Sequence, residues 1–293
     1  MGKTVHGLWW IAAGLVISTF LVSCGSVATN RIAVNRVNHR SNANSARSVH
    51  NGANVSGFHW QLTWDDEFNG QGFPPGWIPL TGGGEDGWSH QELQWNAAGN
   101  ARLDGTGQLV IAANRGGDGQ VCWNGPCQYT SARIQTQGKF SQTYGLFEAR
   151  IKLPAGYGLW PAFWLEGANI DKVGWPRCGE IDVIEFSDHR QRLVAGYAHA
   201  AGHSHNAYYE ANEPLTAGYH VYGIEWTPSG ITWLFDGRPY SYMKSYPGWP
   251  FDHPFFLILD LAVGGAFPGA PDSSTHFPSK MVVDWVRVYR KVT

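Results

Sequence analysis

The sequence predicts an all-β protein, built as a sandwich or a jelly roll, and three observations lead to this prediction. From Phe58 onward, short apolar or alternating runs follow one another and are separated by Gly, Pro and Asn. The 293 residues include 37 Gly and 16 Pro, and no segment has the apolar period of an amphipathic helix. The 15 Trp, 12 Tyr and 14 Phe suit both a sandwich core and a cleft whose aromatic faces stack on sugar rings.

The first residues have the pattern of an export signal. Lys3 provides the positive end, and the apolar run from Leu8 to Val22 is shorter than the ~20 residues that a membrane-spanning helix needs. The run ends in Leu-Val-Ser-Cys, which resembles a bacterial lipobox, so we expect residues 1–23 to be a lipoprotein signal peptide and Cys24 to be lipidated. Ordinary secretory cleavage is the alternative. Lipidation would anchor the exported protein to a bacterial membrane, facing the periplasm or the cell surface.

The composition then changes at two boundaries. Residues 24–56 are rich in Asn, Ser and Arg without a sustained period, which predicts a flexible linker before a folded domain at 57–293. The chain carries a net charge of −2, and five basic but no acidic residues precede Asp65, so the remainder carries −7. This balance predicts no nucleic-acid partner and argues against a polyanionic substrate.

The predicted strands follow one another along this domain. They are QLVIAAN (108–114), FEARIKL (147–153), DVIEF (182–186), YHVYGIEW (219–226), ITWLFDG (231–237), FFLILDLAV (255–263) and MVVDWVRVYR (281–290). Each is bounded by turn-forming residues, which is typical of antiparallel sheets. The pair Asp236-Gly237 predicts a tight hairpin turn.

The cysteines fit an exported protein. Cys122 and Cys127, in CWNGPC, are close enough for a loop disulfide in an oxidising compartment. This pairing leaves Cys178 free beside the acidic strand. Because no histidine lies near it in the sequence, we expect a small buried packing residue rather than a nucleophile.

The segment GEIDVIEF (179–186) places three carboxylates in an otherwise apolar, β-branched strand. Side chains alternate faces along a strand, so Glu180 and Asp182 share one face while Glu185 falls on the other. A β-bulge near residues 183–184 would shift this phase by one residue and return Glu185 to the face of the other two. Because unpaired buried carboxylates are costly, we expect them to serve a purpose rather than to balance surface lysines.

With a bulge, Glu180 and Glu185 become effective i and i+4 positions, whose α-carbons lie about 13 Å apart at roughly 3.3 Å per residue. Glutamates that lean toward each other on a concave strand can approach the roughly 5–5.5 Å between carboxyl groups of a retaining glycosidase, whereas an inverting one keeps about 6.5–9.5 Å. Close like charges separate the two pKa values, so one group can attack while the other donates a proton. Asp182 lies between them and can orient the nucleophile.

The ordered motifs of the chain resemble the family 16 glycoside hydrolases, in particular the bacterial laminarinase-type β-glucanases. The similarity runs from about Leu62 to Tyr289 and rests on TWDDEF (63–68), YTSARIQTQGKFSQTYGLFEARIKLP (129–154), GLWPAFWL (158–165), WPRCGEIDVIEF (175–186), YHVYGIEWTPSGITWLFDG (219–237), LAVGG (261–265) and VDWVRVY (283–289). The resemblance implies a concanavalin A-like jelly roll of two antiparallel sheets with a concave sugar-binding cleft. It identifies residues 57–293 as the catalytic domain.

The resemblance also implies roles for the acidic strand. Glu180 matches the nucleophile of the family, Glu185 the general acid/base and Asp182 the assisting carboxylate. The extra residue before the last glutamate matches the bulged branch of the family, which favours β-1,3-glucan as substrate. No cofactor is implied for catalysis.

Six further positions match sugar-contacting residues of the family: Asn96, Arg133, Trp160, Trp164, Trp175 and His199. The first two match residues that hydrogen-bond sugar hydroxyls in donor subsites, the tryptophans match aromatic cleft residues, and the histidine matches one beside the acid/base. The alternatives are a structural ion pair for Arg133 and core packing for Trp164. His199, His203 and His205 also form a cluster, but no carboxylate motif supports a metal there.

Many members of the family bind a structural calcium on the convex side, and Glu67 and Asp284 match that site. Hard oxygen ligands suit calcium, and two unrelated surface acids are the alternative. The sequence departs from the family at Asp260, where Asn is frequent, and in the insert 116–127. An Asp260 that faces the cleft would add negative charge near the sugar, so both departures bear on fine specificity.

Residues and resemblance together predict a retaining endo-hydrolase that cleaves internal β-1,3-glucosidic bonds of laminarin-like glucans and acts as a monomer. Mixed-linkage β-1,3-1,4-glucanase, galactan- or agar-cleaving and transglycosylating activities are alternatives, because loops determine the choice of linkage. A non-catalytic β-glucan-binding protein is a further alternative, which the retained glutamates oppose.

Overall fold

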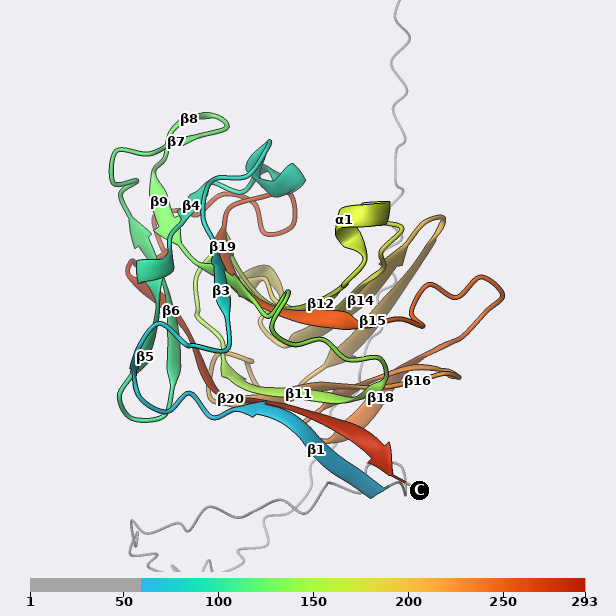
Figure 1. Ribbon diagram of the computed structural model, residues 1–293. Coiled ribbons are helices and arrows are strands. Elements are labelled where there is room, and N and C mark those ends of the chain that lie inside the picture. Colours follow the sequence, from blue (N-terminus) through green and yellow to red (C-terminus); the bar gives the residue numbers. More distant parts are fainter. Residues whose placement is uncertain (1–58, 293) are drawn as a thin grey trace, which may run out of the picture. The chain divides into compact units, whose positions relative to one another are not determined.

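The computed structural model describes residues 59–292, which form two layered β-sheets (Figure 1). The expected signal peptide 1–23, the lipidated Cys24 and the linker 24–56 lie outside the described residues and stay predictions. Within residues 59–292, no helix has the length and the apolar character needed to cross a membrane.

The larger sheet contains most of the strands. Its main path runs in the order β18 (Arg238–Lys244), β17 (Gly230–Phe235), β16 (His220–Thr227), β11 (Gly145–Lys152), β20 (Ser279–Val292), β6 (Leu109–Arg115), β5 (Ala101–Asp104) and β2 (Gln71–Gly72). Three strands join this path from the side: β1 (His59–Asp66) on β20, β9 (Tyr129–Ser131) on β6, and β4 (Gln94–Asn96) on β9. The β4–β9 pair is parallel, and the other pairs are antiparallel.

The smaller sheet carries the acidic strand near its centre. Its strands run in the order β15 (His203–Glu210), β14 (Leu193–Ala200), β13 (Glu180–Glu185), β12 (Leu159–Gly167), β19 (Phe255–Val263), β10 (Arg133–Gln135) and β3 (Ile78–Leu80). All of its pairs are antiparallel. Two stacked antiparallel sheets confirm the predicted jelly-roll sandwich.

The remaining elements are short. A separate hairpin within the insert consists of β7 (Val121–Cys122) and β8 (Gly125–Pro126). The helical segments are α1 (Ile170–Val173) and the single turns Gly87–Gln91, Ala98–Asn100 and Asp188–Arg190.

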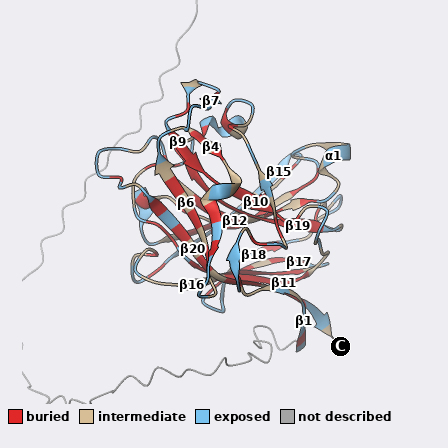
Figure 2. Cartoon of the chain, turned by 60° about the vertical axis from the view of Figure 1, so that its left-hand side comes forward, coloured by how far each residue is buried: buried red, intermediate tan, exposed pale blue. Residues whose placement is uncertain are grey.

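The core lies between the two sheets, where alternate residues of each strand point inward. On β6, Leu109, Ile111 and Ala113 are buried and alternate with partly exposed residues. Strand β19 is buried along its whole length, with one face toward the core and the other beneath the pocket described below. Figure 2 shows the contrast between such buried strands and the largely exposed strands β1 and β18.

The structure confirms the local predictions. Each predicted run coincides with or overlaps a strand, as FFLILDLAV does with β19. The predicted hairpin turn joins β17 to β18, and Asp236 and Gly237 have the positive φ values, 47° and 73°, that a tight two-residue turn requires. A disulfide joins Cys122 to Cys127, and Cys178 is free and buried.

Candidate active site

Strand β13 contains the bulge that the sequence predicts. Toward β12, the consecutive residues Phe163 and Trp164 pair with Ile184 and Asp182, so Val183 has no partner. Toward β14, the register shifts in the same place. The extra residue brings the three carboxylates of the strand to one face, and all three line a single pocket.

Trp233 of β17 holds this bulge from the opposite sheet. Its indole Nε1 donates a hydrogen bond of 2.9 Å to the backbone oxygen of Asp182. A bulge disrupts the ladder, and buried backbone carbonyls need hydrogen-bond donors, so the indole supports the backbone directly beside the bulge. Gly196 makes room for the contact, because a Cβ there would lie 2.5 Å from the Trp233 ring and 2.8 Å from that oxygen.

The pocket has a volume of about 590 Å³ and lies over the smaller sheet. Alternate residues of β12, β13 and β19 form its floor, and residues 85–92, hereafter the wall segment, form one side. On β12 the alternation turns Trp160, Trp164 and Glu166 toward the pocket. The prediction that the two tryptophans share a cleft-facing side of the strand is therefore confirmed.

Glu180 and Asp182 face His199 of the neighbouring strand. His199 Nε2 lies 3.9 Å from Glu180 Oε1 and 3.6 Å from Asp182 Oδ2, while Trp175 Nε1 donates a 2.9 Å hydrogen bond to Glu180 Oε2. Burial and the charge of Glu166 raise the pKa of Glu180 to about 7. Burial and the charge of Glu180 raise the pKa of Asp182 well above its ordinary value, and burial lowers the pKa of His199. These shifts favour the uncharged imidazole of His199 and the protonated form of Asp182.

Glu185 lies beyond the bulge and accepts a 2.8 Å hydrogen bond from Trp160 Nε1. Burial and the charge of Glu180 raise the pKa of Glu185 to about 8. Glu185 thus keeps its proton at a pH where Glu180, with its pKa of about 7, begins to lose its own. One group that can give a proton and one that can attack face the same pocket.

Arg133 of β10 neutralises a second group of acids. Its Nη2 lies 3.0 Å from Glu92 Oε1 and 3.4 Å from Asp260 Oδ2. Trp88 and Trp164 cover the guanidinium, with ring centroids at 4.8 and 5.3 Å, and Trp164 Nε1 donates a 2.9 Å hydrogen bond to Asp260 Oδ1. Arg133 is only 9% exposed, so the structure contains the ion pair that was the alternative for this residue. Asp260 does line the pocket, but in contact with a cation.

Asn96 does not line the pocket, and the three histidines that lie close in the sequence do not share one face. Asn96 is 1% exposed and does not line the pocket, because the alternation of β4 turns it inward, so a sugar contact by Asn96 is not supported. Across β14 and β15, Ala198 pairs with His205 and Ala200 with His203. Paired residues share a face, so these two histidines point away from the face of His199.

The two residues expected to bind calcium are each ion-paired with an arginine. Arg287 contacts both carboxylate oxygens of Glu67, at 2.7 and 3.0 Å, and Arg150 lies 2.7 Å from Asp284. A calcium ion held by these side chains would have to displace both arginines. Their arrangement does not fit such a site.

The pocket also contains acids and aromatic residues that sequence reasoning missed. Glu166 stands directly opposite Glu180 in the sheet and lines the pocket, and burial raises the pKa of Glu166 to about 7. Its signal was present, because Glu166 continues the alternation of GLWPAFWLEG. Glu92 and Trp88 lie in a segment without a regular pattern, so no comparable signal points to them.

A family model, a related protein and two solved structures each match more than half of this chain. The model of the family "Glycosyl hydrolases family 16" matches residues 89–287. A β-glucanase of Rhodothermus marinus is 37% identical over 256 residues, which cover 80% of this chain and 86% of that protein. An endo-β-1,3-glucanase structure from Pyrococcus furiosus superposes with a TM-score of 0.77 at 41% identity, covering 82% of this chain and 97% of its own. The laminarinase catalytic domain of Thermotoga maritima MSB8 superposes with a TM-score of 0.75 at 40% identity, covering 80% and 99%.

Proposed function

This chain belongs to family 16 of the glycosyl hydrolases, and we propose that it is an endo-acting, retaining β-1,3-glucanase. The observation that carries the proposal is the bulge in β13, which brings Glu180 and Glu185 into one pocket. The chemistry of such a pair needs no cofactor.

The reaction proceeds by two displacements. The Glu180 carboxylate attacks the anomeric carbon, and the bond to the departing sugar breaks as Glu185 gives its proton to the leaving oxygen. Water then attacks the same carbon, Glu185 takes a proton from that water, and Glu180 leaves as a carboxylate. Two inversions restore the β-configuration.

The surroundings of the two glutamates support this division of roles. Glu185 has the higher pKa, about 8, which suits the proton donor, and Glu180, with a pKa of about 7, ionises first. Asp182 and His199 lie on the Glu180 side of the bulge and position the nucleophile. Trp175 and Trp160 each fix one glutamate through an indole hydrogen bond.

The choice of β-1,3-glucan rests on the relatives and on the chemistry of the pocket. The relatives described above are a β-glucanase, an endo-β-1,3-glucanase and a laminarinase. Trp160, Trp164 and Trp175 line the pocket and offer aromatic faces to sugar rings. The many carboxylates around them disfavour a sulfated or uronate polymer.

The first experiment measures reducing-sugar release from soluble laminarin. We expect Glu185→Gln to lower kcat by roughly 10²- to 10⁴-fold, the usual range for loss of a general acid/base, and Glu180→Ser to lower it at least as much. Glu210→Gln is the matched control, because Glu210 is exposed on β15 and pairs with Arg192. Near-wild-type hydrolysis by either pocket variant would overturn the assignment.

A polysaccharide panel tests the linkage. Laminarin, lichenan, agarose and xyloglucan are incubated with the enzyme, and the product sizes are followed over time. An endo-β-1,3-glucanase releases intermediate oligosaccharides first and favours laminarin. Faster cleavage of lichenan or agarose would select one of the alternative activities, and binding of laminarin without release of sugar would indicate a non-catalytic binding protein.

The lipid anchor, the structural calcium and the monomeric state are further proposals, and each has its own test. We expect labelled palmitate to be incorporated into the wild-type protein but not into Cys24→Ser. This result would place the enzyme on a bacterial membrane. If a calcium ion stabilises the domain, its removal by a chelator should lower the melting temperature. The arginines paired with Glu67 and Asp284 argue against a calcium ion at those two residues. We expect a monomer in sedimentation.

A further inference from the structure

The insert 116–127 packs against the wall segment of the pocket. The insert contains the hairpin β7–β8, and the disulfide Cys122–Cys127 closes it. We propose that this insert is a brace that holds the wall segment in the conformation that binds glucan, with Trp123 as the positioning residue. The inference rests on the proposed function and deepens it, because it assigns the insert to substrate affinity rather than to bond cleavage.

The wall segment has an unusual backbone. Asp86, Trp88, Ser89 and Gln91 have φ values of 46°, 57°, 63° and 62°. Residues other than glycine rarely occupy this left-handed region, and such a backbone persists only where its surroundings hold it. The segment has backbone hydrogen bonds of its own, from Ser89 N, Gln91 N and Glu92 N, of 2.9–3.2 Å. Because several strained residues follow one another, the segment needs contacts from outside.

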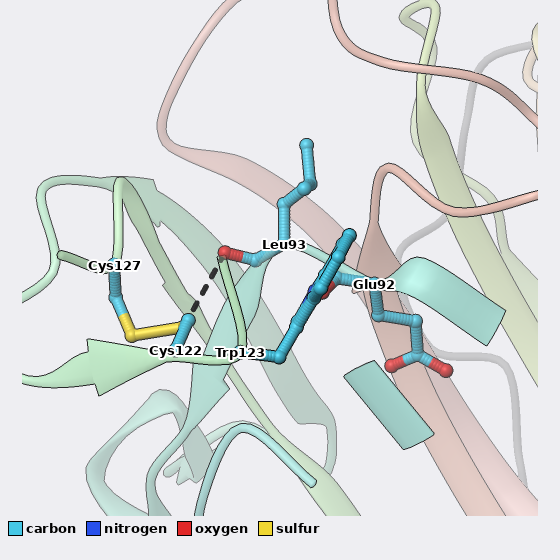
Figure 3. Close-up of a disulfide and its surroundings, with 5 residues drawn as sticks. All are labelled: Glu92, Leu93, Cys122, Trp123 and Cys127. Atoms are coloured by element: carbon cyan, nitrogen blue, oxygen red, sulfur yellow. Dashed lines mark hydrogen bonds between the residues drawn. A yellow bond between two sulfur atoms is a disulfide. The ribbon is translucent and has the colours of Figure 1, made fainter. Parts of the chain in front are cut away.

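The insert provides such contacts (Figure 3). Trp123 Nε1 donates a 2.7 Å hydrogen bond to the backbone oxygen of Glu92, and Cys122 Sγ lies 3.7 Å from the backbone oxygen of Leu93. The close approach of Trp123 depends on glycine, since a Cβ on Gly87 would lie 2.7 Å from Trp123 Nε1. The indole therefore contacts the last residue of the wall segment, and the disulfide contacts the residue that follows it.

Glu92 connects this contact to the pocket. Its backbone oxygen accepts the bond from Trp123, and its side chain reaches Arg133 at 3.0 Å. Arg133 in turn contacts Asp260 and lies against Trp88 of the wall segment. This series of contacts leads from the insert to residues that shape the pocket, and it does not involve Glu180 or Glu185. A loosened insert should therefore weaken substrate binding more than it slows the chemistry.

Hydrogen exchange of the wall amides tests the brace without any substrate. In Trp123→Phe, which keeps an aromatic ring but loses the N–H, we expect the amides of Ser89, Gln91 and Glu92 to exchange about tenfold faster, the effect of one lost hydrogen bond. The double variant Cys122→Ser/Cys127→Ser should show the same change. Trp249→Phe is the matched control, because Trp249 makes the same kind of bond, to the Phe251 oxygen, outside the pocket lining.

Kinetics on laminarin then separate affinity from chemistry. We expect KM to rise about 3- to 10-fold in Trp123→Phe, with kcat changed less than about twofold and Trp249→Phe unchanged in both. Unchanged exchange of the wall amides in both insert variants would overturn the brace, as would a fall in kcat at constant KM. If the wall amides exchange faster in the insert variants but the wild-type protein does not cleave laminarin, the proposed function is refuted and the brace is still supported.

Discussion

Two groups of acidic residues line one pocket, and they have different hydrogen-bonding and ion-pair partners. Glu92 and Asp260 share the guanidinium of Arg133, at 3.0 and 3.4 Å. Glu180 and Glu185 each accept an indole hydrogen bond, and neither has an arginine within ion-pair distance in the described residues. Burial raises the pKa in both groups, and contact with Arg133 opposes that rise in the first.

The difference separates structural from reactive carboxylates. An acid that shares a buried arginine has a partner that favours its charged form and fixes its neighbours, so it is suited to hold the shape of the pocket. An acid that receives only neutral donors titrates near neutral pH, so it can exchange protons and attack. The same pocket therefore contains a fixed ionic network beside a pair that can change charge.

The largest expected effect comes from removing the arginine. Arg133→Met leaves Glu92 and Asp260 buried without their cation, and breaking a buried pair in this way typically costs about 3–5 kcal/mol in the free energy of unfolding. Urea unfolding measures the change. Arg192→Met is the control, because its pair with Glu210 is exposed, and we expect a loss of about 1 kcal/mol or less.

A second variant keeps this prediction testable if Arg133→Met does not fold. Adding Glu92→Gln and Asp260→Asn removes the unbalanced charges, so the triple variant should recover most of the lost stability. A triple variant no more stable than Arg133→Met would show that the acids are not the cause.

Trp233→Phe should have an intermediate effect. It removes the indole donor from the backbone oxygen of Asp182, and the loss of one intramolecular hydrogen bond costs about 0.5–1.5 kcal/mol in the free energy of unfolding. We expect kcat to fall as well, because the bulge that aligns the reactive pair is less well held. Trp249→Phe should be milder, since its acceptor, the Phe251 oxygen, keeps a second donor in Trp226. Equal losses in the free energy of unfolding of the two variants would contradict a special role of Trp233.

The last expected effect has the opposite sign, a gain in stability. Because the pKa of Glu185 is raised to about 8, the folded state holds this proton after the unfolded chain has lost it, and the free energy of unfolding falls as the pH rises from the ordinary range of a glutamate to about 8. Glu185→Gln removes this penalty. Its melting temperature should match wild type near pH 4 and exceed it at pH 8, by about 2–4 °C for each kcal/mol. A variant that is less stable than wild type at pH 8 would show that Glu185 has a hidden ionic partner.

Local patterns were enough to predict the strands, the hairpin turn at Asp236-Gly237 and the bulge in β13. Each depends on residues that are neighbours in the chain, so alternation and turn chemistry determine it. The same alternation along β12 could have identified Glu166 as a pocket residue.

The ionic network could not be predicted in the same way. Arg133 is 41 residues from Glu92 and 127 from Asp260, and only the assembled sheet brings them together. The wall segment was equally hidden, because its left-handed residues follow no sequence rule and depend on contacts from elsewhere in the fold. Asn96 illustrates the converse, since its motif matched a sugar-binding position while its strand buries it.

Chemical rescue with azide most directly tests whether Glu180 attacks and Glu185 donates the proton. An aryl β-laminaribioside with a good leaving group is incubated with azide and with Glu180→Ala or Glu185→Ala, and the anomeric configuration of the glycosyl azide is read by proton NMR. A single displacement by azide in Glu180→Ala gives the α-azide, whereas attack on the glycosyl-enzyme in Glu185→Ala gives the β-azide. The reversed pattern, or the same azide from both variants, would contradict the assignment.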